Sequence, residues 1–224
     1  MQTDITNNTR NFVVVGEEIR YYVNVSANTE PSSVQINGVE ATKGGEFAGP
    51  GVSNTIWYVT WSRANKGIYD MSVEVTSGGK SATVPMPAVT VYGLTLGTRT
   101  NNPDTSGATM YMLQNSAYTN TYMTAIDTNL SASISQNYYS LFTIEGNKIK
   151  SEARDTYLTG TNGSVSFGAG TNYTIAASGN NIRITYRSGW STYNMTQSSN
   201  ISIGMSYSTT NRNWNLYPVT YDIP

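Results

Sequence analysis

The sequence predicts an all-β protein built from two domains. In the first half, apolar and polar residues alternate over short runs bounded by Gly, Pro and Asn, which is the pattern of half-buried strands. The second half repeats itself three times, and nowhere does the 3.6-residue apolar period of a helix persist for even three turns. A chain of 224 residues exceeds the usual size of one domain, which favours two domains of roughly 100 residues each.

Composition excludes several classes of function. The chain has no His and no Cys, so the usual zinc, copper and haem ligand sets, Ser-His-Asp triads and disulfides cannot be assembled. With 13 Lys and Arg against 14 Asp and Glu, the charge balance does not suit a nucleic-acid surface, which needs clustered cations. Thr, Ser and Asn make up more than a third of the residues. We therefore expect a binding or structural module that is not an enzyme and holds no cofactor or metal.

Alternation predicts strands in the first half of the chain. The predicted strands are Phe12 to Val15, Ile19 to Ser26, Ser33 to Ile36, Thr55 to Ser62, Gly67 to Thr76 and Lys80 to Val91. The apolar residues at odd positions from Tyr69 to Val75 share one face, and so do Trp57 and Trp61, so both faces should be core. Six or seven strands at about ten-residue spacing pack most naturally as an antiparallel sandwich.

Glycine-containing turns separate these strands. Asn37-Gly38, Lys43-Gly44-Gly45 and Ser77-Gly78-Gly79 each suit a backbone with positive φ. A longer polar stretch, Thr98 to Gly107, carries Pro and Gly and has no apolar period, which indicates a linker. The predicted domains are therefore 1–97 and 108–224, joined by the linker 98–107.

A short motif in the first domain resembles a known family. The segment Asn65-Lys66-Gly67-Ile68-Tyr69-Asp70-Met71 is similar to the strand-F signature of immunoglobulin domains, Asp-x-Gly-x-Tyr-x-Cys, with Met71 in the Cys position. The resemblance implies that Tyr69 forms a tyrosine corner, in which the hydroxyl ties a loop to the start of the strand. It also implies an immunoglobulin-like β-sandwich, similar to the bacterial Ig-like repeats that act as spacers in surface proteins.

The repeat in the second half has a period of about 35 residues. Each unit carries a tyrosine, aliphatic or apolar residues eight and ten positions after it, an aromatic residue that opens its last strand, and an apolar anchor before the tyrosine. These positions are Tyr122, Tyr157 and Tyr193; Leu130, Val165 and Ile201; Ala132, Phe167 and Ile203; Phe142, Tyr173 and Trp214; and Leu113, Ile149 and Ile184. We expect the three repeat tyrosines to fill the core.

Three units of four short strands describe a β-trefoil, with six strands in a barrel and six in the hairpins that cap it. The alternatives are a solenoid, which would need end caps that the sequence does not show, and a three-bladed propeller, which is smaller than usual. The layout resembles ricin B-like trefoils and, more loosely, trefoil modules of surface and secreted proteins of gut Firmicutes.

The sequence departs from the ricin pattern at the residues implied in sugar binding. Those lectins carry Gln-x-Trp near the end of each unit, whereas the triplets here are Ser140-Leu141-Phe142, Thr171-Asn172-Tyr173 and Arg212-Asn213-Trp214. Where the resemblance implies a sugar-binding Asp, the chain has Thr124, Thr159 and Thr196. Galactose binding in the manner of that family is therefore not expected.

Candidate ligand contacts come from loop aromatics and their polar neighbours. Aromatic faces stack on sugar C–H surfaces while Asp, Asn and Gln meet the hydroxyls, and the second domain holds 12 of the 17 tyrosines. The predicted ligand-binding residues are Asp127, Asn129, Tyr138 and Tyr139 in the first unit, and Trp190, Gln197 and Asn200 in the third. Exposed tyrosines serve protein interfaces equally well, so that interpretation stays open. No catalytic residues are predicted, because the acids Glu145, Glu152 and Asp155 lie beside basic residues in what reads as a solvated turn.

These observations predict a non-catalytic extracellular or cell-surface module. The trefoil would recognise a glycan or glycoprotein and the sandwich would act as spacer, in a monomer or part of a longer chain. No stretch approaches the ~20 apolar residues of a membrane span. The N-terminus lacks the apolar core of a secretory signal, so the chain is either an intracellular or phage protein or, as we favour, a piece of a longer secreted chain. The alternatives are a protein-interaction or structural accessory region of a larger secreted enzyme, and a phage decoration protein.

Overall fold

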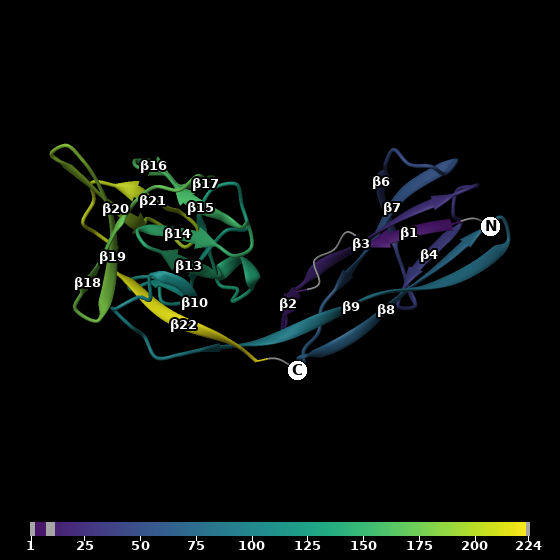
Figure 1. Ribbon diagram of the computed structural model, residues 1–224, viewed down its shortest axis with the longest axis horizontal. Helices are drawn as coiled ribbons and strands as arrows, with labels where there is room; N and C mark the ends of the chain where they lie inside the picture. The colour runs from purple at the N-terminus through teal and green to yellow at the C-terminus, as the bar shows by residue number, and fades with distance from the viewer. Residues whose placement is uncertain (1–2, 8–11, 223–224) are drawn as a thin grey trace. The chain divides into compact units, whose positions relative to one another are not determined.

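The computed structural model describes residues 3–7 and 12–222 and is all-β, as the sequence predicts (Figure 1). Its one helical element within these residues is the short 3-10 turn η1 (Tyr138–Ser140). The chain divides into two compact units: unit 1 is Met1–Gly93 with Asp222–Pro224, and unit 2 is Leu94–Tyr221. Within the described part of the chain, no helix has the length and apolar character needed to cross a membrane.

Unit 1 is built from two sheets. The strands of the first are β1 (Thr3–Asn7), β3 (Ile19–Ala27), β7 (Ser53–Trp61) and β6 (Thr42–Glu46), in that spatial order and all antiparallel. The strands of the second are β5 (Val39–Glu40), β4 (Ser33–Ile36), β8 (Gly67–Ser77), β9 (Lys80–Leu96) and β2 (Phe12–Val14), with β2 parallel to β9. Apolar side chains of both sheets bury one another in a single core, because the longer strands β3, β7 and β8 turn alternate residues inward, whereas β5 and β6 have no buried residue.

All six strands predicted in the first half are present, with ends shifted by a few residues. Strands β1, β5 and β6 were not predicted. The turns at Asn37-Gly38 and Gly78-Gly79 are confirmed by positive φ at all four residues. The turn predicted at Lys43 to Gly45 is wrong. Those residues lie inside β6, where a shift of register against β7 absorbs the glycine pair without reversing the chain.

The predicted core contacts of unit 1 are confirmed. Trp57, Trp61 and Met71 are buried, and the hydroxyl of Tyr69 donates to the carbonyl oxygen of Asn65 at 2.8 Å, the bond expected of a tyrosine corner. The rings of Trp61 and Tyr69 meet edge to face at 5.7 Å. The guanidinium of Arg63 lies 4.7 Å from the Trp61 ring and 5.1 Å from that of Tyr69, so it covers the exposed rim of this aromatic pair.

Unit 2 consists of three consecutive sets of strands, called repeats one, two and three. Repeat one is β10 (Ser106–Asn115), β11 (Tyr122–Thr124), β12 (Ser131–Ser133) and β13 (Phe142–Glu145). Repeat two is β14 (Lys148–Ser151), β15 (Thr156–Thr159), β16 (Gly163–Ser164), β17 (Ser166–Gly168) and β18 (Thr174–Ser178). Repeat three is β19 (Asn181–Ser188), β20 (Ser191–Gln197), β21 (Ile203–Ser206) and β22 (Trp214–Asp222).

The same strand pairings recur around unit 2. The last strand of each repeat pairs with the first strand of the next, as β13–β14, β18–β19 and β22–β10. First and last strands also pair within repeats one and three, and in repeat two the amide of Tyr173 donates to the carbonyl of Asn147 at 2.8 Å, just before β14. These contacts close six strands into a ring. The middle strands form the hairpins β11–β12, β15–β17 and β20–β21.

The aromatic residue that opens the last strand of each repeat is buried. Phe142, Tyr173 and Trp214 are at most 1% exposed, and the apolar anchors Leu113, Ile149 and Ile184 are fully buried. Residues 98–107 belong to unit 2 in this structure. There Thr100 pairs with Leu216, and the amide of Asp104 donates to the hydroxyl of Tyr111 at 2.7 Å.

The prediction that the repeat tyrosines fill the core is wrong. Tyr122, Tyr157 and Tyr193 are only half-buried, because apolar residues one or two positions later in each strand take the inward places. These inward residues are Met123, Leu158 and Met195, each fully buried.

Ile201 is not a core residue, although it occupies the repeat position of Leu130 and Val165. Its side chain is 70% exposed, whereas Ile203 and Met205 are buried. The core aliphatic follows the tyrosine by eight residues in repeats one and two, as Leu130 and Val165 show, but by ten in repeat three. Two extra residues in repeat three therefore change which position after the tyrosine faces the core.

Candidate functional site

A cavity of about 770 Å³ in unit 2 is the candidate binding site. Its walls come from the loop and strand 127–131 of repeat one, from β16 of repeat two, and from residues between 196 and 211 of repeat three. Most of its lining side chains carry hydroxyls or amides, with a single carboxylate. The polar lining includes Asp127, Asn129, Ser131, Ser164, Thr196, Gln197, Ser202, Ser206, Thr210 and Asn211.

Backbone contacts between the three hairpins hold the cavity walls together. The amide of Leu130 donates to the carbonyl of Val165 at 2.6 Å, and that of Ala132 donates to Ile201 at 3.1 Å. The strand β16 pairs with β21 at very close range, since a Cβ on Gly204 would lie 2.7 Å from the carbonyl oxygen of Gly163. Glycine is therefore required at 204 for this wall to form.

An arginine from repeat two fixes the loop that carries Asp127. The Nε of Arg154 donates to the carbonyl of Ala125 at 2.7 Å, and its Nη2 donates to those of Ile126 and Asp127 at 3.1 and 2.5 Å. The planar guanidinium also lies 4.7 Å from the ring of Phe167. The exposed carboxylate of Asp127 accepts from the hydroxyl of Ser131 at 3.2 Å. Its position at the cavity therefore depends on contacts to its backbone from another repeat.

Gln197 is the most buried of the predicted ligand contacts. It is 1% exposed, and its Nε2 donates to the hydroxyl of Thr121 and to the carbonyl of Ser199, both at 2.9 Å. The amide of Gln197 donates to the backbone carbonyl of Asn211 at 3.3 Å, and the Nδ2 of Asn211 donates to the carbonyl of Gln197 at 3.2 Å. The Oε1 of Gln197 has no partner among the described residues. One buried acceptor is thus left unsatisfied beside the cavity, which is unfavourable unless a donor reaches it.

The structure regroups the predicted ligand-binding residues. Asp127 and Asn129 from repeat one line the same cavity as Gln197 from repeat three, although the sequence assigned them to separate sets. Asn200 is exposed on the adjoining turn but does not line the cavity. Tyr138 and Tyr139 lie half-buried in η1, away from the lining, where the hydroxyl of Tyr138 donates to the carbonyl of Glu152 at 2.9 Å.

Trp190 stands at the tip of the hairpin that joins β19 to β20. The turn is Gly189-Trp190, with φ of 58° at Gly189, and the Trp190 side chain is 98% exposed. A tryptophan buries more area than other residues when it finds a contact, so near-complete exposure is uncommon. This residue is separate from the cavity and forms a second candidate contact.

Three tyrosines lie in a row across the sheet of repeat three. Tyr186 pairs with Tyr193, whose ring centroid lies 4.3 Å from that of Tyr207, and the two hydroxyls are 2.5 Å apart. This hydrogen bond raises the pKa of Tyr193 and lowers that of Tyr207. The contact between the rings of Tyr193 and Tyr207 helps to hold strand β20 to the end of β21, while the Tyr207 side chain stays 61% exposed.

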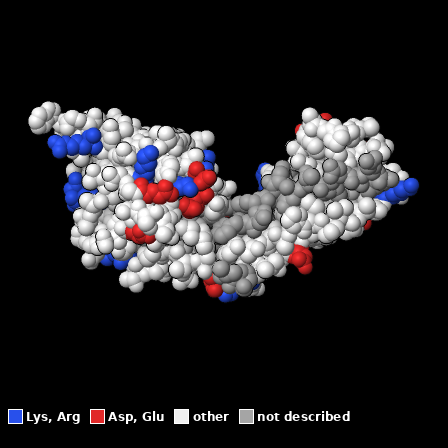
Figure 2. Space-filling model, in the orientation of Figure 1, with Lys and Arg blue, Asp and Glu red and all other residues white. Residues whose placement is uncertain are grey.

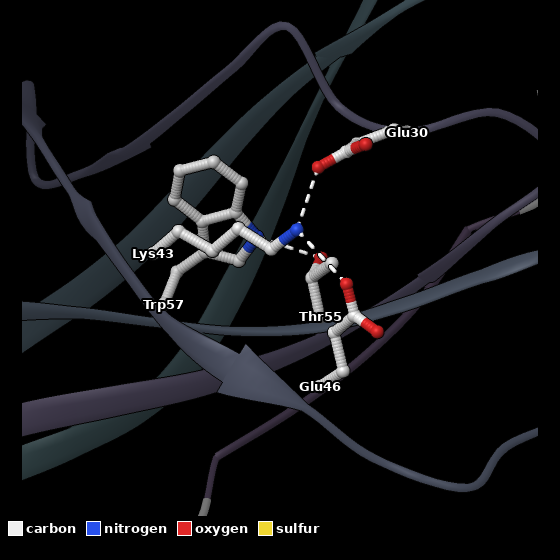
Figure 3. A network of polar contacts seen from close by, with 5 residues as sticks. All are labelled: Glu30, Lys43, Glu46, Thr55 and Trp57. Atoms are coloured by element: carbon white, nitrogen blue, oxygen red, sulfur yellow. Dashed lines mark hydrogen bonds and ion pairs between the residues drawn. The ribbon is translucent and has the colours of Figure 1, made fainter.

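A smaller pocket of about 360 Å³ in unit 1 contains two carboxylates that share one lysine. The Nζ of Lys43 lies 2.7 Å from Glu30 and 3.2 Å from Glu46, beside the bond from Trp57 to Thr55 (Figure 3). These hydrogen bonds raise the pKa of Lys43. On the face seen in Figure 2, most of the described surface carries no charged residue. Within the residues described, no group of three or more acidic side chains could hold a metal ion.

Sequence reasoning missed the serine and threonine residues of the cavity. Ser131, Ser164, Thr196 and Ser206 line it, but in a chain so rich in Thr, Ser and Asn nothing marks these hydroxyls among the rest. The longer spacing between the tyrosine and the core aliphatic in repeat three was the available signal.

Comparison with known proteins gives no match at any of three levels. No family model, no curated protein and no solved structure is similar to this chain. The function must therefore be argued from the residues of the chain itself.

Proposed function

We propose that the chain is a non-catalytic extracellular or cell-surface module whose unit 2 is a β-trefoil that binds a glycan or glycoprotein in its cavity. Unit 1 serves as an immunoglobulin-like spacer. The ring of six strands capped by three hairpins, repeated every 35 residues or so, supports the trefoil assignment. Two packed sheets and the bond from Tyr69 to Asn65 support the immunoglobulin-like assignment.

The observation that carries the proposal is the chemistry of the cavity lining. A sugar hydroxyl both donates and accepts, and the Ser, Thr, Asn and Gln side chains that line the cavity have the same double capacity. Asp127 is the one ionisable residue in the described lining, so a neutral ligand meets no strong uncompensated field. No aromatic residue belongs to that lining, and recognition would therefore rest on hydrogen bonds rather than on stacking.

A glycan array followed by calorimetry on the array hits tests this function. Asn129→Ala removes an amide from the cavity and should weaken binding about fivefold to tenfold, the effect of losing one neutral hydrogen bond. Asn200→Ala is the matched control, because it removes the same group from an exposed position that does not line the cavity. Failure of every sugar to bind, or an equal loss in both variants, would refute the assignment of the cavity.

A second candidate function is a protein-interaction region, either of a larger secreted enzyme or of a phage decoration protein. The exposure of Trp190 favours it, because tryptophan is enriched at the centres of protein interfaces and rarely stays fully exposed. Trp190→Ala distinguishes the two functions. It should abolish capture of a protein partner and leave sugar binding in the cavity unchanged.

A further inference from the structure

The sequence contains two Asn-Gly pairs, Asn37-Gly38 in unit 1 and Asn162-Gly163 in unit 2. An asparagine before glycine is chemically labile, because no Cβ on the glycine hinders its nitrogen from attacking the asparagine side chain. The two pairs differ sharply in what surrounds the asparagine, and this difference separates a protected pair from a reactive one.

The side chain of Asn37 is held at both of its polar atoms. Its Oδ1 accepts from the amide of Ser72 at 2.7 Å and from the Ser72 hydroxyl at 3.3 Å, while its Nδ2 donates to the carbonyl of Asp70 at 3.2 Å. The amide of Asn37 also donates to the carbonyl of Ser72 at 2.9 Å. The side-chain carbon therefore cannot turn toward the nitrogen of Gly38 unless these bonds break first.

Asn162 lacks such restraint. Residues 161–164 are all exposed, and within the described chain the Asn162 side chain has no hydrogen-bond partner. Gly163 has a φ of 75°, and no heavy atom lies within 4 Å of the place where its Cβ would stand. The Asn162 side chain is thus free to turn toward the nitrogen of Gly163, and no side chain of the glycine blocks its approach.

We propose that Asn162 is a deamidation site whose conversion alters the wall of the cavity. The Gly163 nitrogen bonds to Cγ of Asn162 while the bond from Cγ to Nδ2 breaks, and ammonia leaves with the proton from the Gly163 amide. Water then opens the cyclic imide at either carbonyl, giving aspartate or isoaspartate. One water is consumed and one ammonia is released, so no other reactant is needed.

The product lies directly on the candidate site. Gly163 lines the cavity and pairs with Met205 across β16–β21, a ladder of two residue pairs. Isoaspartate lengthens the main chain by one methylene just before this pairing, and either product adds a negative charge next to Gly163 of the cavity wall. The effect on ligand binding rests on the proposed function, whereas the reaction itself does not.

Peptide mapping of the full chain, aged in mildly alkaline buffer with and without denaturant, tests the site. In the folded chain the Asn162 peptide should show the mass shift of an amide converted to an acid. It should also become a substrate for an isoaspartate methyltransferase. The Asn37 peptide should convert at least roughly tenfold more slowly than in denaturant, because it must first open locally. Asn162→Gln is the control and should remove the acidic variant from ion-exchange profiles.

The outcome separates this inference from the proposed function. The deamidation site is overturned, even if sugars bind, if Asn162 stays intact in the folded chain or if Asn37 converts there at the same rate as Asn162. Conversion of Asn162 in a chain that binds no sugar would uphold the site and refute the lectin function. If sugars bind, the aged protein should bind them more weakly than the aged Asn162→Gln variant, and equal binding would overturn the effect on the cavity.

Discussion

Replacing Arg154 by alanine should loosen the loop that carries Asp127 and destabilise unit 2. The substitution removes donors to the carbonyls of Ala125, Ile126 and Asp127. Ala125 is fully buried, so its carbonyl loses a partner that water does not readily replace, at a cost of about 1–3 kcal/mol. Loss of the guanidinium over the Phe167 ring adds about 0.5–1 kcal/mol.

Urea unfolding and hydrogen exchange together measure this effect. We expect the free energy of unfolding to fall by about 2–3 kcal/mol, and the amide of Leu130, which bonds to Val165, to exchange faster. Arg187→Ala is the control, since it also removes one positive charge but loses only a bond to Gly189 in its own exposed hairpin.

Arg154→Lys tests whether the planar fork or the charge matters. A lysine ammonium keeps the charge but cannot reach three carbonyls in one plane, so most of the loss should remain. Full stability in this variant would refute the reasoning, as would an Arg154→Ala effect no larger than that of the Arg187 control.

Three further predictions concern a hydrogen bond, two buried tyrosines and a close backbone approach. Tyr69→Phe should lower the free energy of unfolding by about 1 kcal/mol in a urea titration, because only the bond to the Asn65 carbonyl is lost; an unchanged midpoint would contradict the corner. Burial raises the pKa of both Tyr21 and Tyr173 to about 12. The folded chain then retains protons that the unfolded chain loses, so stability present below pH 10 should decline by about 2–3 kcal/mol per tyrosine as pH rises from 10 to 12. Alkaline unfolding followed by the absorbance of tyrosinate checks this prediction. A free energy of unfolding that stays constant over that pH range would contradict it. Gly204→Ala should separate β21 from β16, because its Cβ would sit 2.7 Å from the carbonyl oxygen of Gly163, and thermal melts should show a lower Tm.

The strands were predictable because their signal is local. In β8 the alternation of apolar and polar residues matches the burial observed from Met71 to Val75, and Asn37-Gly38 adopts the positive φ that its residues favour. The pair Gly44-Gly45 looks the same in sequence but extends within β6, because pairing with β7 decides its conformation. Pairing with a distant strand overrides the local preference here, and the two glycines alone do not indicate it.

The candidate site was predictable only in part, for a related reason. Asp127, Asn129 and Gln197 were recognised as polar loop residues, but their meeting depends on how repeat one packs beside repeat three. The role of Arg154 was not foreseen. It reads as one charge among several in a solvated turn, whereas its guanidinium binds backbone carbonyls of another repeat, and carbonyls carry no sequence signal.

The extra length of repeat three accounts for where the cavity lies. In repeat three the core aliphatic Ile203 follows Tyr193 by ten positions instead of eight, the strand β20 continues to Gln197, and the turn after it is exposed. Ile201 leaves the core and joins the cavity lining, while Gln197 enters the buried position beside Thr121. Three identical repeats would close their hairpins equally around the axis. Two residues at which repeat three departs from the other repeats, Gln197 and Ile201, therefore line the cavity together with the loop 127–131 of repeat one and β16 of repeat two.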